Sequence, residues 1–140
     1  KDIAISKLSR DMYLDLPTTE EIHAKVVKKS APIKAILLDQ AVFAGIGNWI
    51  ADEVLYVAGI RPARLGNSLS IKETEKLREA IRVVLDHAVK VGADKEQFPE
   101  SWLFHHRWGG SKGEDIIEGQ QIIREQIGGR TTAWVPSRQK

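Results

Sequence analysis

Residues 37–55 read LLDQAVFAGIGNWIADEVL: the end of an apolar helix, a glycine-rich turn and the start of a second helix. Gly45 and Gly47 permit backbone angles that side chains resist, so the chain can reverse direction within a few residues. Asn48 is a residue type preferred at the N-cap, and apolar residues continue from Trp49 at helical spacing. This stretch therefore predicts two helices joined by a tight turn.

The start of the second helix is a candidate phosphate site. The first N–H groups of a helix have no partner within the helix, and its dipole places partial positive charge there. A plain corner between two helices would contain the same residues, because glycine–x–glycine alone does not separate the two cases. A structural corner and a phosphate-binding turn therefore both stay open at this point.

The composition indicates a globular protein of one domain, or of two small ones. Of its 140 residues, 42% are hydrophobic and 29% are charged, and no apolar run approaches the roughly 20 residues that a membrane helix needs. The chain has no cysteine, which excludes disulfides and thiolate metal sites. A net charge of +2 says little about nucleic acid, so the distribution of charge matters more.

Four helices are expected between residues 18 and 92, after an entry segment over residues 1–17 that Pro17 ends. Their starts are indicated by capping signals: Thr18 with Glu21, Ser30 with Pro32 in the first turn, Asn48, and Ser70 with Glu73. Gly59 and Gly92 are expected to end the third and fourth helices. Behind Ser70, apolar residues recur every three or four positions, so the fourth helix should be long and amphipathic.

Lysines gather in and after the first expected helix, at Lys25, Lys28, Lys29 and Lys34. They form either a solvated face or a patch that steers phosphates, and the sequence favours neither. His23 and His87 are expected to be surface or core residues, since no partner at metal-ligand spacing accompanies them.

The pattern changes after Gly92. Residues 121–127 and 130–135 are rich in β-branched residues and are separated by Gly128 and Gly129, which predicts a β-hairpin. A lone hairpin is marginally stable, so it must pack on something. The expected packing partners are aromatic side chains, namely Trp102, Phe104, Trp108 and Trp134.

Two motifs together resemble one protein family. The string LLDQxxxxGIGNxxADEVL resembles the helix-two-turns-helix signature of the formamidopyrimidine-DNA glycosylase and endonuclease VIII (Fpg/Nei) family. Residues 104–109 (FHHRWG) and 129–140 (GRTTAWVPSRQK) resemble the C-terminal "zincless finger" of the eukaryotic, metal-free branch of that family. The resemblance implies a mainly α fold, with a four-helix helix-two-turns-helix domain over residues 18–92 followed by a zincless-finger β-hairpin over 93–140.

The resemblance also implies a function, base-excision repair, in which an oxidised base is removed and the strand is cleaved at the abasic site. In the family the turn asparagine and the finger arginine hold the phosphates beside the flipped nucleotide, and these roles fall on Asn48 and Arg130. The expected DNA-binding set is Gly47, Asn48, Arg130, Lys34, Gly129 and Thr131. Glu53, near the start of its helix, is expected to support the turn, and Trp134 the hairpin; no cofactor and no metal are expected.

The family's nucleophile is an N-terminal proline followed by glutamate, whereas this chain begins Lys1-Asp2-Ile3-Ala4. We therefore expect the DNA-binding half of a glycosylase/AP lyase, with no catalytic residue in this chain and a catalytic domain ahead of it. The expected partner is double-stranded DNA with oxidised-base or abasic lesions, bound by a monomer, and the family implies a nuclear location. The alternative is a non-catalytic nucleic-acid-binding module that reuses the helix-two-turns-helix; the arginine hairpin argues against it.

Overall fold

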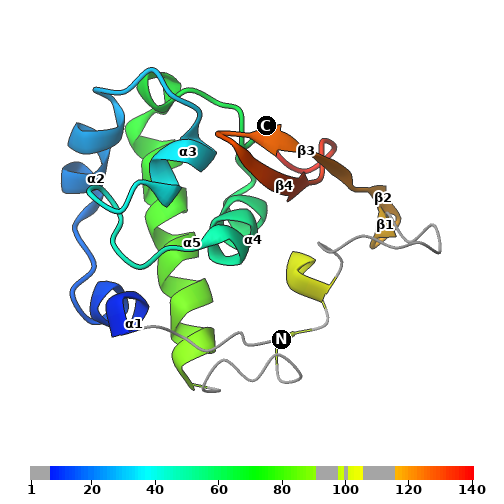
Figure 1. The fold of residues 1–140 in the computed structure, drawn as a ribbon, viewed down its shortest axis with the longest axis horizontal. Helices are drawn as coiled ribbons and strands as arrows, with labels where there is room; N and C mark the ends of the chain where they lie inside the picture. The colour runs from blue at the N-terminus through cyan, green and yellow to red at the C-terminus, as the bar shows by residue number, and fades with distance from the viewer. Residues whose placement is uncertain (1–6, 91–97, 100, 106–115) are drawn as a thin grey trace.

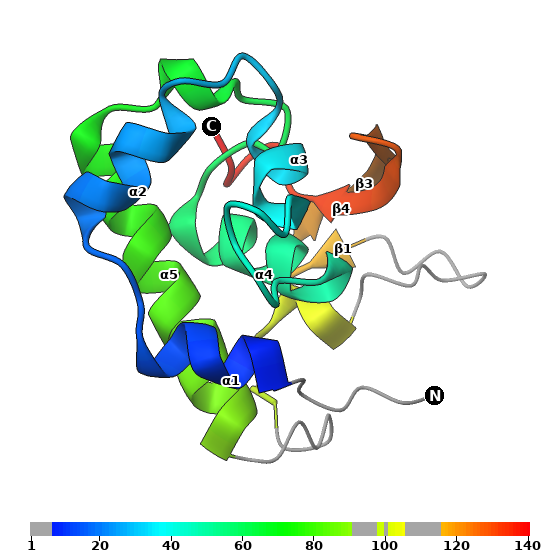
Figure 2. The same cartoon turned by 60° about the vertical axis from the view of Figure 1, so that its left-hand side comes forward.

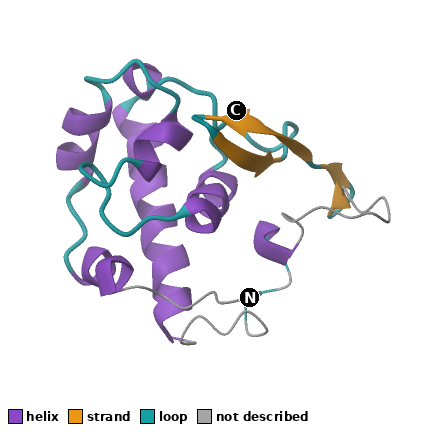
Figure 3. Ribbon diagram, in the orientation of Figure 1, coloured by secondary structure: helices purple, strands orange, loops and turns teal. Residues whose placement is uncertain are grey.

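The computed structural model describes residues 7–90, 98–99, 101–105 and 116–140. Within them the helices are α1 (Lys7–Leu14), α2 (Thr19–Val26), α3 (Ile33–Leu38), α4 (Asn48–Ala58) and α5 (Ile71–Lys90), with short 3-10 helices η1 (Gly66–Ser68) and η3 (Leu103–His105). The strands are β1 (Ile116–Ile117), β2 (Gln120–Gln121), β3 (Ile123–Ile127) and β4 (Arg130–Trp134). The α-helices occupy one side of the molecule, and the strands and η3 lie on the other (Figures 1 and 3). The mainly α fold expected from the sequence is confirmed.

The long helix α5 runs through the helical unit, and α1, α2 and α4 pack against it (Figures 1 and 2). Its buried face carries the apolar positions that the sequence pattern predicted, from Leu77 through Ile81 to Leu85 and Ala88. Residues of α2, α3, α4 and the glycine turn complete one continuous core, including Ile22, Ile33, Leu37, Phe43, Ile46 and Val54. No helix in the described part of the chain is long and apolar enough to cross a membrane.

Both predicted capping boxes are present. The Thr18 hydroxyl accepts from the Glu21 N–H at 3.2 Å, while the Glu21 carboxylate accepts from the Thr18 N–H at 2.9 Å. Ser70 and Glu73 make the same reciprocal pair at the start of α5. Each box satisfies backbone donors that the helix itself leaves without partners.

The entry segment contains a helix that was not predicted from the sequence. Residues 7–14 form α1, which packs on α5, and the Tyr13 hydroxyl donates to Asp86 of that helix. Helix α3 is also shorter than expected: it begins at Ile33 after Pro32 and has no side-chain cap, so Ser30 does not cap it. The expected helix end at Gly92 and the packing of Trp108 lie outside the described residues.

The predicted hairpin is confirmed as β3–β4, which pair antiparallel with Ile127 opposite Arg130 and Ile123 opposite Trp134. Gly128 and Gly129 form its turn with φ of +62° and +79°, angles that glycine adopts without strain. A second antiparallel pair, β1–β2, was not predicted; its two-residue strands are too short to show an alternating pattern. Side chains around the hairpin's base, from Tyr56, Leu103, Ile117, Ile122, Ala133 and Val135, form a second apolar cluster.

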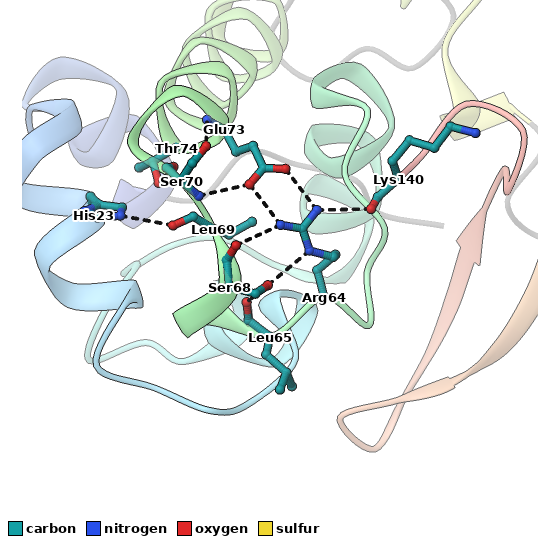
Figure 4. A network of polar contacts seen from close by, with 9 residues as sticks. All are labelled: His23, Arg64, Leu65, Ser68, Leu69, Ser70, Glu73, Thr74 and Lys140. Carbon is teal, nitrogen blue, oxygen red and sulfur yellow. Dashed lines mark hydrogen bonds and ion pairs between the residues drawn. The ribbon is translucent and has the colours of Figure 1, made fainter.

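The segment after β4 returns to the helical unit. The Lys140 N–H donates to the Gly59 carbonyl at 2.9 Å, and the Lys140 carbonyl accepts from Arg64 at 3.1 Å. Arg64 also makes a bidentate ion pair with Glu73, as Figure 4 shows. Its Nη2 donates to Glu73 Oε1 at 2.9 Å and its Nη1 to Oε2 at 3.0 Å. This ion pair lowers the pKa of Glu73, chiefly through the hydrogen bond from Arg64. The hairpin is therefore held to the helices at its C-terminal end as well as by its apolar base.

Candidate nucleic-acid interface

The glycine turn between α3 and α4 lies directly against α1. Gly45 has φ of +92°, and a Cβ there would come within 2.4–2.6 Å of the backbone of Leu8 and Ser9. The Ser9 hydroxyl donates to the Gly45 carbonyl. Glycine is required at position 45 for both reasons, its backbone angle and the close approach of α1.

Gly47 and Asn48 differ from their predicted roles. The N-cap of α4 is Gly47, with φ of −95° and ψ of −173°, and Asn48 is the first helical residue, so the N-cap assignment of Asn48 was wrong by one position. The backbone at Gly47 is extended and open to any residue, and a Cβ there would meet no atom within 4 Å. The fold itself therefore does not demand glycine at position 47, and the N-terminus of α4 is open on that side.

Asn48 reaches the hairpin. Its side-chain amide Nδ2 donates to the carbonyl of Thr131 at 3.1 Å, across 83 positions of sequence. Its Oδ1 is buried and receives no hydrogen bond from the described residues. The structure thus brings together the start of α4 and the N-terminal end of β4, two of the segments singled out in the sequence.

Arg130 is exposed at the first position of β4, directly after the glycine turn of the hairpin. The turn rests on α3, where a Cβ at Gly128 would lie 2.9 Å from the Cβ of Ala35. The neighbouring Gly129 has no atom within 4 Å of the place a Cβ would take. The tip therefore combines an exposed guanidinium with an open backbone, next to α3.

Lys34 was wrongly expected to be a surface phosphate contact. Its side chain is fully buried, and its ammonium lies 2.7 Å from Asp52 Oδ1 and 2.6 Å from Thr132 Oγ1. Other lysines of the predicted patch do lie at the surface: Lys28 is exposed and Lys29 is partly exposed, and both line a hollow of about 440 Å³ that Ala35 also borders. The exposed part of the patch is therefore adjacent to the hairpin tip.

Glu53 supports a different segment from the one expected. It is 1% exposed, and its two carboxylate oxygens accept from the backbone N–H groups of Leu103 at 3.0 Å and Phe104 at 2.7 Å. It thereby fixes η3 on α4, rather than the glycine turn for which it was proposed. The ring of Trp49, also on α4, packs against Phe98, Trp102 and Phe104, with ring centroids 5.3, 6.5 and 5.0 Å away.

Trp134 is 4% exposed at the end of β4. Its indole N–H donates to Glu125 of β3 at 2.7 Å, and the guanidinium of Arg61 lies 4.9 Å from its ring centroid. A cation over an aromatic face is attracted by the ring's quadrupole. Trp134 therefore joins both strands of the hairpin to the loop that follows α4.

Asp52 and Thr132 were missed in the sequence. Asp52 is 1% exposed in α4, and Thr132 is fully buried in β4. The available signal was a carboxylate among buried apolar positions, between Ala51 and Val54, because such a charge needs a partner. Nothing in the described residues gathers three or more side chains of the metal-binding types.

Comparison with known proteins gives consistent matches. The family model described as "Formamidopyrimidine-DNA glycosylase H2TH domain" matches residues 8–100. A formamidopyrimidine-DNA glycosylase of Arabidopsis thaliana is 46% identical over 136 residues, which cover 97% of this chain and 35% of that protein. One from Prochlorococcus marinus (strain MIT 9215) is 38% identical over 131 residues, covering 86% and 45%.

Solved structures match as well. The Lactococcus lactis Fpg in complex with DNA containing an abasic site superposes with a TM-score of 0.70 at 28% identity, over 88% of this chain and 48% of that one. MutM in complex with DNA containing carbocyclic 8-oxo-G gives 0.73 at 27% identity, over 88% and 46%. This chain thus spans between about a third and a half of the length of these relatives.

Proposed function

Because this chain belongs to the formamidopyrimidine-DNA glycosylase family, we propose that it is the DNA-binding half of a base-excision-repair glycosylase. In this proposal it holds the backbone phosphates beside the nucleotide that is turned out of the duplex. Extruding a base costs a few kcal/mol, and fixed contacts to the backbone help to hold the opened, bent duplex.

One observation carries the proposal: Asn48 at the start of α4 is hydrogen-bonded to the strand that begins with Arg130. An amide and a guanidinium are both donors that suit phosphate oxygens, and the guanidinium can bind a phosphate bidentately, through two parallel hydrogen bonds. Contacts of this kind fix position on the duplex and do not read sequence. Asn48 lies on α4, and Arg130 directly precedes the Thr131 whose carbonyl Asn48 binds. The two donors therefore suit neighbouring phosphates of one DNA strand.

The open backbone at Gly47 and Gly129 supports the same assignment. No atom of the described residues occupies the space beside either glycine, so a phosphate can approach the main chain there. At Gly47 it would meet the free N–H groups and the positive dipole end of α4. The exposed Lys28 and the partly exposed Lys29 next to the tip would add a screened, long-range attraction for the DNA.

We place the removal of the oxidised base and the lyase step outside residues 1–140. A lysine at the surface is a poor imine-forming nucleophile without a pocket that positions it against the sugar. The chain should therefore bind DNA with an abasic or oxidised-base lesion and leave it chemically unchanged.

Borohydride trapping on abasic-site DNA, run beside a gel-shift assay, tests this division. The 140-residue chain is expected to shift the DNA and to form no covalent adduct, with the affinity falling as salt rises. Addition of the family's N-terminal domain should restore trapping. A covalent adduct formed by the 140-residue chain alone, or the absence of any DNA shift at low salt, would contradict the proposal.

A further inference from the structure

We propose that the buried pair Lys34–Asp52 is a positioning device for the phosphate grip, which sets where Arg130 lies relative to Asn48. This inference rests on the proposed function and deepens it. The pair connects three elements that are distant in sequence: Lys34 comes from α3, Asp52 from α4, and both bind β4.

A chain of hydrogen bonds leads from the pair to Arg130 itself. The Lys34 ammonium donates to Thr132 Oγ1 at 2.6 Å, and the Thr132 hydroxyl donates to the Arg130 carbonyl at 3.1 Å. The ammonium is held in turn by Asp52 Oδ1 at 2.7 Å. The backbone of Arg130 is therefore two hydrogen bonds away from a fixed, buried charge.

A second branch fixes the next residues of the strand. The other oxygen of Asp52 accepts from the Ala133 N–H at 3.2 Å. The Thr131 carbonyl accepts from Asn48 at 3.1 Å and lies 3.4 Å from the Lys34 ammonium. Thr131, Thr132 and Ala133 are thus hydrogen-bonded directly to Asn48, Lys34 or Asp52. Arg130 is connected to Lys34 through the Thr132 hydroxyl.

The physical character of these contacts separates positioning from simple stabilisation. Apolar packing at the base of the hairpin is non-directional, so it holds the hairpin without fixing its angle. Charge-assisted hydrogen bonds are directional and short. A buried ion pair is weak evidence for stability, because its desolvation offsets much of its attraction, and apolar replacements are often tolerated. Fixing the geometry of β4 is the role that remains for Lys34 and Asp52 here.

The test is a thermodynamic cycle between the pair and Arg130. The double variant Lys34→Met/Asp52→Asn removes both charges yet leaves an amide oxygen to accept from Ala133, so the buried N–H keeps a partner. A second variant, Thr132→Val, leaves the ion pair in place and removes the hydroxyl that joins the Lys34 ammonium to the Arg130 carbonyl. Arg130→Ala is made in the wild-type chain and in both variants, and Arg82→Ala of α5 is the matched control.

Affinity is measured by fluorescence anisotropy with a labelled duplex that carries a tetrahydrofuran abasic-site analogue. We expect the double variant to bind about tenfold more weakly while it unfolds within a few degrees of wild type. Arg130→Ala should weaken binding at least about fivefold in the wild-type chain and less than about twofold in the double variant, because the misplaced guanidinium no longer contributes. Thr132→Val should lower affinity in the same direction, and it serves alone if the double variant does not fold.

The experiment distinguishes a failure of the positioning role from a failure of the proposed function. If Arg130→Ala costs the same factor in every background, or if both variants bind as wild type does, the pair does not position Arg130. If Arg130→Ala and Asn48→Ala leave the wild-type affinity unchanged, the proposed function itself fails, and the inference fails with it.

Discussion

Replacing Glu53 by glutamine should destabilise the protein far more than its small change in shape suggests. The carboxylate is 1% exposed and accepts from the backbone N–H groups of Leu103 and Phe104. A glutamine has one acceptor oxygen, so its NH₂ group must face one of these two donors. The loss of a charge-assisted hydrogen bond costs about 1.5–3 kcal/mol, and an unsatisfied buried N–H costs about 1–3 kcal/mol more.

We therefore expect Glu53→Gln to lower the free energy of unfolding by roughly 3 kcal/mol, which for a chain of this size lowers Tm by roughly 10 °C. Urea unfolding followed by tryptophan fluorescence measures the change, since Trp49 and Trp102 lie in the aromatic cluster beside η3. The matched control is Glu79→Gln on α5, where the side chain is 55% exposed and pairs with Arg82. This control should stay within about 0.5 kcal/mol of wild type. Equal effects of the two substitutions would refute the role assigned to Glu53.

Three further expectations follow from the structure. Because Arg64 lowers the pKa of Glu73 below its usual 4.5, the stability that this carboxylate contributes is present above pH 4.5 and is lost as the pH falls below it. Urea titrations at several pH values should show a shallower acid-side loss for Glu73→Gln than for wild type, and identical slopes would count against the ion pair. Gly45→Ala should cost about 2 kcal/mol or more, since its Cβ would collide with α1 and its φ is positive, whereas Gly47→Ala should cost less than about 1 kcal/mol yet weaken DNA binding. A Gly45→Ala protein as stable as wild type would disprove the close approach. Elemental analysis of the purified chain should find no stoichiometric zinc, because the cysteine ligands of a zinc-bound finger are absent from the sequence, and one zinc per chain would contradict this.

Local signals in the sequence predicted the local structure well. The capping boxes at Thr18 and Ser70 and the glycine turn of the hairpin each depend on residues at most a few positions apart. The residue types of such a short segment are enough to predict its structure. The N-cap of α4 was predicted one residue too late, at Asn48 instead of Gly47. Glycine and asparagine are both acceptable N-caps, and the Asn48 side chain donates to Thr131, a distant contact that the local sequence does not show.

Contacts between distant segments were not predictable in this way. Lys34 resembles the exposed lysines before it in sequence, and it is buried because Thr132, 98 positions later, and Asp52 supply its partners. Glu53 was assigned to the nearby turn, whereas its partners lie about 50 positions downstream. Residues 7–14 form a helix through packing on α5, although their own pattern is too short to predict one. The sequence thus indicated which segments matter, and tertiary contacts determined which side chain of each segment faces which partner.

The most direct test of the phosphate grip is the salt dependence of DNA affinity for wild type, Asn48→Ala, Arg130→Ala and the control Arg82→Ala. Affinity for a duplex with a tetrahydrofuran site would be measured between about 50 and 200 mM salt. The account predicts that Asn48→Ala and Arg130→Ala each weaken binding by roughly 1–3 kcal/mol. Arg130→Ala alone should also reduce the slope of log affinity against log salt by about one phosphate contact, and Arg82→Ala should match wild type. Unchanged affinity and slope for both Asn48→Ala and Arg130→Ala would contradict the account.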